Sequence, residues 1–283
     1  MRLIRTTLIA AALATAAFSS VAFAAPVILN WELKPTVAAD SKGINNLSYN
    51  GESYIVNAVG GGGAFTFTDN GVFNIIQKNG GLPLTLAGGQ LTAVYSGGSG
   101  SGSLTSGNFT FNAGGTLNFY YNTTPTYGTK AANNYGASDG TLIGTFSQLA
   151  GGGGSINPDG TPAANGQITS LFRATFLAAG VWLDSAAADL NGRIPFLLGF
   201  TTVNANEDIS ANGPCPGGGV TCTIDPNLVG ALGAIIPNDP PNHFLVRNGG
   251  QFQLEAQVPE PGTIALLGLG LLGLGFGVTR RRS

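Results

Sequence analysis

Short segments in which apolar and polar residues alternate recur along most of this chain. Residues 116–122 read TLNFYYN, so that Leu117, Phe119 and Tyr121 fall on one face of an extended strand. Further strand patterns, several of them rich in β-branched or aromatic residues, occur at residues 26–33, 91–95, 141–146, 167–177, 194–203 and 243–254. Many strands separated by glycine-rich turns predict an all-β fold, which we expect to be a single β-sandwich or jelly-roll-like domain.

Two pairs of these segments predict β-hairpins. Residues 64–68 and 72–77 flank Asp69-Asn70-Gly71, and residues 108–112 and 116–121 flank Ala113-Gly114-Gly115. Asn-Gly tolerates the positive φ angles that a tight hairpin turn requires. Both tripeptides are therefore predicted to be turns.

Short helices and long loops are also predicted between the strands. Short helices are predicted at residues 185–190 and 227–235, the second with Pro226 at its first position. Residues 96–102, SGGSGSG, have the composition of a linker. Long glycine-rich loops are expected at residues 151–166 and 207–241.

Residues 1–24 have the three parts of a secretory signal peptide. Arg2 and Arg5 precede an uncharged, apolar run, and Ala22-Phe23-Ala24 fits a small-residue cleavage site. We expect cleavage after Ala24; the alternative is an uncleaved anchor helix. Export implies an oxidising compartment, in which Cys215 and Cys222, the two cysteines of the chain, would form a disulfide. A zinc site at these cysteines is less consistent with the sequence, because zinc needs further ligands and His243 is the one histidine.

The last 26 residues combine three unlike features. Val258-Pro259-Glu260-Pro261 precedes a charge-free apolar run, for which we predict a transmembrane helix over about residues 263–279, and Arg280, Arg281 and Arg282 follow. A cluster of arginines is typical of the cytoplasmic side of such a helix. This segment could be the last helix of the fold, a permanent membrane anchor or a sorting signal that is later removed. The first is disfavoured because the run is apolar on every face.

This order of features resembles the PEP-CTERM sorting signal of Gram-negative bacteria. The resemblance implies that Val258, Pro259, Glu260 and Pro261 are recognised by an exosortase, a membrane protease, and that the helix is a transient inner-membrane anchor. Residues 91–104, 116–121 and 181–184 also resemble flocculation-associated PEP-CTERM proteins. That resemblance implies a cell-surface or matrix protein that supports aggregation, floc or biofilm formation beside an exopolysaccharide.

The part between the two ends, residues 25–257, is poor in charge. It carries seven basic and thirteen acidic residues, a net charge of −6. Nucleic acid is therefore not an expected partner, because no basic patch is available for phosphates. One domain is expected, since the strands on either side of the long loops are too short to form separate cores.

No pattern typical of a catalytic centre is present, so we expect no enzymatic activity, no metal and no cofactor. His243 reads as a residue at a strand start. A glycosidase needs two carboxylates, for which the sequence offers Asp184 with Asp189, or Glu207 with Asp208. Oxygen ligands for calcium could come from Asp189 and Asn191, or from Asn157 and Asp159, although turn formation explains these residues equally well.

Aromatic residues leave a carbohydrate-binding module open as the alternative function. Trp182 beside Asp184 could form a sugar-stacking platform, and so could a cluster of tyrosines at positions 120, 121, 127 and 135. The other expectation for such rings is packing in the core or between strands.

Overall fold

The computed structural model describes residues 26–161, 163, 166–193, 196–208, 226–234 and 242–256. Most of this part of the chain forms one antiparallel sheet of eleven strands. The strands are β3 (Leu47–Val59), β4 (Ala64–Lys78), β5 (Leu82–Pro83), β6 (Gln90–Ser103), β7 (Asn108–Phe111), β8 (Thr116–Asn122), β9 (Thr141–Gln148), β10 (Gly153–Ser155), β11 (Gly166–Leu177), β13 (Phe196–Asp208) and β14 (His243–Ala256). The all-β prediction is thus confirmed.

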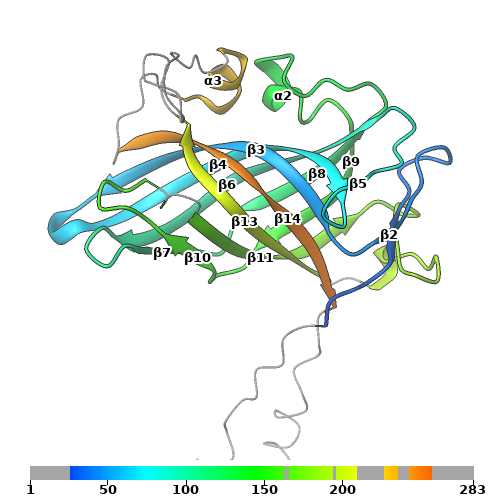
Figure 1. Cartoon of the computed structure of the whole chain (residues 1–283), viewed down its shortest axis with the longest axis horizontal. Helices are drawn as coiled ribbons and strands as arrows, with labels where there is room; N and C mark the ends of the chain where they lie inside the picture. The colour runs from blue at the N-terminus through cyan, green and yellow to red at the C-terminus, as the bar shows by residue number, and fades with distance from the viewer. Residues whose placement is uncertain are drawn as a thin grey trace, which may run out of the picture.

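The sheet closes on itself, so the predicted sandwich or jelly roll is wrong. β14 pairs with β3 from His243 opposite Val56 to Phe252 opposite Leu47. These strands lie side by side in Figure 1, β3 in blue and β14 in orange. The ring runs β3-β4-β6-β8-β9-β11-β13-β14, an eight-stranded barrel in which each strand pairs with the next one in this order and β14 pairs with β3. A barrel of this size has an interior that side chains fill, or that holds one small ligand.

β7 and β10 complete the ring at one end of the barrel. β6 pairs with β8 through residues 90–96 and with β7 through residues 100–103. β11 likewise pairs with β9 through residues 172–177 and with β10 through residues 168–169. The ring therefore passes through β8 and β9 at one end and through β7 and β10 at the other. The predicted hairpin of residues 108–112 and 116–121 is wrong, because β7 and β8 each pair with β6.

The predicted turn at Asp69-Asn70-Gly71 is also wrong, since β4 runs through it without a break. Asp69 pairs with Ile55 and Gly71 with Ser53 on β3. The irregularity lies in β6, where Gly97 has a φ of +68° and donates its N–H to Asn70 Oδ1 at 3.0 Å. A bulge in the partner strand leaves β4 extended.

Residues 96–102 belong to β6 and do not form a linker. The alternation of serine and glycine has the period of a strand, with the glycines facing inward. A Cβ at Gly100 would lie 2.3 Å from Phe67 Cζ, and one at Gly102 would lie 2.5 Å from Phe65 Cζ. The absent side chains therefore make room for the two phenylalanine rings.

A small second sheet plugs one end of the barrel. It consists of β1 (Trp31–Leu33), β2 (Ser41–Ile44) and β12 (Trp182–Leu183). Trp31 and Trp182 stack with their ring centroids 5.5 Å apart, and Phe119 and Phe146 pack edge-on against Trp182. In Figure 1 this sheet lies near the β2 label, away from β7 and β10. The tryptophan pair thus closes the end formed by β8 and β9.

Two helices cover part of the outer surface, above the strands in Figure 1. They are α2 (Ala132–Tyr135) and α3 (Pro226–Leu232), which confirms the helix predicted from Pro226 onward. Leu228 of α3 belongs to a cluster with Tyr54, Val72 and Leu245, whose side chains point outward from the barrel. The other predicted helix, at residues 185–190, is a turn region instead. The expected loop at residues 151–166 contains β10.

Candidate functional site

A polar layer crosses the barrel interior between two apolar regions. Its side chains come from inward-facing positions of neighbouring strands and are at most 6 % exposed. The buried polar members are Ser53, Gln148, Ser170, Thr202 and Asn248. On the plugged side lie core residues such as Phe73, Phe119 and Phe252; on the other side lies an aromatic cluster that includes Phe65, Phe67, Phe111 and Phe244. Because buried polar groups destabilise a core unless they are paired, the partners of each group in this layer decide what the layer contributes.

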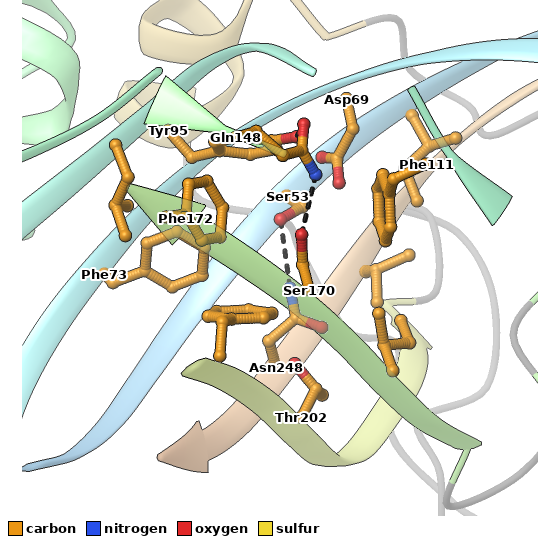
Figure 2. A pocket seen from close by; sticks show the side chains of 15 residues that line it. Ser53, Asp69, Phe73, Tyr95, Phe111, Gln148, Ser170, Phe172, Thr202 and Asn248 are labelled. Atoms are coloured by element: carbon orange, nitrogen blue, oxygen red, sulfur yellow. Dashed lines mark hydrogen bonds between the residues drawn. The ribbon is translucent and has the colours of Figure 1, made fainter. Parts of the chain in front are cut away.

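The layer surrounds a cavity of about 30 Å³ (Figure 2). A volume of this size accommodates a group no larger than one or two water molecules. The cavity is lined by the polar side chains together with aromatic rings. The rings are those of Phe73, Tyr95, Phe111, Phe172 and Phe200.

One wall of the cavity is a short chain of hydrogen bonds. Tyr95 donates its hydroxyl to Gln148 Oε1 at 2.5 Å, and Gln148 Nε2 donates to Ser170 Oγ at 2.8 Å. The arrangement depends on Gly115, since a Cβ there would lie 2.5 Å from Gln148 Oε1. Gln148 is thereby fixed with both ends of its amide engaged.

The opposite wall carries a buried carboxyl group. Asn248 Nδ2 donates to Ser53 Oγ at 3.0 Å, and Ser53 in turn forms a hydrogen bond with Asp69. Burial raises the pKa of Asp69 to about 7, although the hydrogen bond from Ser53 acts in the opposite direction. The cavity lining contains no lysine, arginine or histidine among the described residues. Asp69 therefore has no cationic partner there.

Two acceptor atoms in this wall have no hydrogen-bond partner among the described residues. They are Asp69 Oδ1 and Asn248 Oδ1, and both are closed off from solvent. Asn248 is 5 % exposed, whereas Asp69 as a whole residue is partly exposed through its other atoms. In Figure 2 both side chains point toward the space that Gln148 and Ser170 also face. The site thus offers two unused acceptors and needs hydrogen-bond donors.

A second cavity of about 30 Å³ adjoins the first on the side of the aromatic cluster. Ile55 and Ile168 line both cavities, so they form the wall between them. The second cavity is apolar apart from Asn57, and its rings are Phe65, Phe67, Phe109 and Phe244. The two cavities together thus combine an apolar space with a few convergent polar groups, on a scale that suits only a few atoms.

Trp182 cannot serve as a sugar platform, because it is fully buried in the plugged end. Its Nε1 donates to the carbonyl oxygen of Ile143 at 2.7 Å. Three of the four tyrosines of the predicted platform, Tyr120, Tyr127 and Tyr135, pack against one cluster on the outer side and are partly buried there, whereas the fourth does not. Tyr121 points into the barrel and donates to the Leu86 carbonyl, whereas Tyr127 and Tyr135 pack edge to face on the outer side.

The nominated acids form turns. Asp184 accepts hydrogen bonds from the backbone N–H of Ala186 and Ala188 and from Arg193, which together lower its pKa. Asp189 accepts from the backbone N–H of Gly180 and Asn191. Their oxygens are thus engaged in local structure, as the turn interpretation predicts.

The side chains of the second pair of acids are not described, whereas the other calcium candidate forms a turn. Glu207 and Asp208 lie on β13, and their side chains are outside the described part of the chain. Asp159 accepts from the backbone N–H and hydroxyl of Thr161, and Asn157 also contacts Thr161. Among the described residues no three His, Cys, Asp or Glu side chains gather as metal ligands would.

Of the remaining predicted residues, the structure describes only His243. His243 is the first residue of β14, as expected. The predicted cleavage site (Ala22, Ala24), disulfide (Cys215, Cys222), sorting residues (Val258, Pro259, Glu260, Pro261) and terminal arginines (Arg280, Arg281, Arg282) lie outside the described residues, as does the helix predicted at 263–279. Within the described part, no helix has the length and apolar character needed to cross a bilayer.

Asp69 is a residue of the site that the sequence predictions place in a turn and not in the interior. A signal was nevertheless present, because Phe65, Phe67, Asp69, Gly71 and Phe73 follow one another at every second position. A period of two places all five on one face of a strand. The uninterrupted pattern would have predicted a carboxyl group among inward-facing rings.

Comparison with known families bears on the end of the chain. Residues 257–282 match the model of the PEP-CTERM protein-sorting motif. The chain carries a PEP-CTERM sorting signal. This confirms the resemblance seen in Val258, Pro259, Glu260 and Pro261, and it supports export, processing by an exosortase at the membrane, and sorting to the cell surface. No curated protein and no solved structure matches the chain.

Proposed function

We propose that this protein is a non-enzymatic component of the surface or exopolysaccharide matrix of a Gram-negative bacterium, where it supports cell aggregation, floc or biofilm formation. The observation that carries the proposal is the PEP-CTERM sorting signal at residues 257–282. A protein delivered by this signal acts after its release from the inner membrane. The barrel is then the part that remains to contact the matrix.

The outer face of the barrel around β6, β7 and β10 suits contact with a neutral polysaccharide. These three strands contain no charged residue. Paired positions place exposed hydroxyls in one row across the strands, which we call the hydroxyl row: Thr66, Ser101, Thr110 and Thr169, with Gly153 between the last two. Neighbouring strands are about 4.8 Å apart, and each hydroxyl both donates and accepts hydrogen bonds. The row therefore offers a regular set of groups that match sugar hydroxyls.

Deletion of residues 258–283 tests the sorting part of the proposal. We expect the truncated protein to be lost from the surface fraction of the producing cells, and aggregation to fall in a sedimentation assay. Complementation with the full chain is the control. Unchanged fractionation together with unchanged sedimentation would contradict the proposal.

The polysaccharide contact is tested separately, with the variants Ser101→Lys and Thr110→Lys. A lysine in the hydroxyl row replaces small hydroxyls with a long charged side chain, so we expect several-fold weaker retention on exopolysaccharide purified from the same cells. The matched control is Thr124→Lys, at an exposed threonine outside the strands. Equal retention of all three variants would show that the row does not bind the polysaccharide.

A further inference from the structure

The interior polar layer has features that a matrix role does not require. Asp69 and Asn248 each present a buried acceptor oxygen without a partner among the described residues. Both face a cavity that is otherwise lined mostly by apolar and aromatic side chains. A carboxylate in such surroundings is costly unless a proton or a cation accompanies it. A ligand that brings positive charge and hydrogen-bond donors would therefore suit the ionised carboxylate and both acceptors.

We propose that this cavity binds the ammonium group of a short primary alkylamine, whose carbon chain extends past Ile55 and Ile168 into the second, apolar cavity. An ammonium group has three donors and no acceptor, which suits Asp69 Oδ1 and Asn248 Oδ1. The rings of Tyr95, Phe111 and Phe172 line the same space and favour a cation. The carbon chain would then contact Phe67 and Phe244.

A metal ion fits the site less well. Calcium takes six to eight oxygen ligands, and magnesium requires octahedral geometry. Most oxygen atoms that line the cavity already take part in hydrogen bonds within the protein. Gln148 donates its amide N–H to Ser170 and accepts the hydroxyl of Tyr95 at its amide oxygen. The hydroxyl of Thr202 is hydrogen-bonded to that of Tyr49. Two unengaged acceptors amid aromatic rings match an organic cation better.

The binding test compares three probes of similar size with the full chain: n-butylammonium, 1-butanol and butyrate, followed by isothermal titration calorimetry at pH 8. We expect butylammonium to bind at least tenfold more tightly than butanol, and butyrate not to bind. Equal affinities for the amine and the alcohol would overturn the proposal. So would a failure of all three to bind, which would leave water as the occupant.

Asp69→Asn removes the charge with little change in shape, and the matched control is Asp159→Asn, at an exposed acid in a loop. We expect the first variant to lose the preference of at least tenfold for the amine over the alcohol, and the second to keep it. Retention of the preference in Asp69→Asn would overturn the proposal. Sodium and calcium chloride are titrated in parallel, and competition by either metal at micromolar concentration would assign the site to a metal instead.

The pH dependence of the unmodified protein gives a test that needs no variant. The other titratable groups that act on Asp69 are Tyr49 on β3 and Tyr95 on β6, and burial raises the pKa of both above the usual value. They stay neutral between pH 6 and 8, so among the residues that line the cavity Asp69 is the one that changes charge in this range. We expect butylammonium to bind severalfold more tightly at pH 8 than at pH 6, whereas butanol shows no such change. A flat profile for the amine would contradict the assignment.

Discussion

The two ends of the barrel are closed in different ways. At the end formed by β8 and β9, the small sheet inserts Trp31 and Trp182, which are both at most 1 % exposed. At the end formed by β7 and β10, a cluster of phenylalanines encloses an apolar cavity, and Phe109 stays partly exposed. The first end is a packed core and the second retains internal space. The polar layer with Asp69 lies between them, so a ligand would enter from the phenylalanine side.

Truncation of Trp182 should have the largest effect on stability. Trp182→Ala removes the stacking on Trp31 and the hydrogen bond to Ile143, and it leaves a cavity in the plug. We expect the free energy of unfolding to fall by about 3–5 kcal/mol, as for other buried tryptophans. Urea denaturation followed by circular dichroism measures the change. A loss below about 1 kcal/mol would show that the plug does not hold the barrel closed.

The second-largest effect on stability is expected from Asp69, in the polar layer between the two ends. Because the pKa of Asp69 is raised to about 7 in the folded protein from 3.8, the folded state binds more protons than the unfolded state between these values. Stability should therefore be highest below about pH 4 for this group and fall as the pH rises toward 7. The total change is on the order of 4 kcal/mol.

Asp69→Asn should remove that part of the pH dependence and stabilise the protein at pH 8. Denaturant unfolding at pH 5, 6, 7 and 8 measures both effects, with Asp159→Asn as the control that keeps the slope. Parallel pH profiles for the unmodified protein and Asp69→Asn would contradict the burial of this carboxyl group.

A smaller effect is expected for Gly100→Ala in β6. The new Cβ would lie 2.2 Å from the carbonyl oxygen of Thr110 and 2.3 Å from Phe67, so the strand or the ring must move. We expect a loss of about 1–3 kcal/mol, typical of overpacking. Ser101→Ala, at the exposed neighbour, should change stability by less than about 0.5 kcal/mol. Equal effects of the two variants would show that the serine-glycine segment does not face the barrel interior.

The smallest effect should come from Phe109→Ala at the end that retains space. Phe109 packs edge-on against Phe67 and Phe111, but it is only partly buried. We expect a loss of about 1–2 kcal/mol, below that of Trp182→Ala. The same variant widens the second cavity and should change amine affinity more than Trp182→Ala does. Equal stability losses for the two variants would remove the distinction between the ends.

Several elements were predictable from local pattern alone. The strand at residues 116–122, with Leu117, Phe119 and Tyr121 facing the core, follows from a period of two, and α3 begins at the proline that predicts it. The sorting signal was readable for a different reason, because its recognition depends on the linear order of a tripeptide, an apolar run and arginines.

The tertiary structure decided what local pattern leaves open. Asp69-Asn70-Gly71 has the composition of a turn, yet it continues β4, because pairing with β3 and β6 on both sides satisfies its backbone groups. Residues 96–102 look like a linker, yet their glycines accommodate rings from β4. By itself the sequence determined the β-rich class and the sorting signal. Closure of the sheet, which depends on pairing between the distant strands β3 and β14, placed Asp69 inside the barrel.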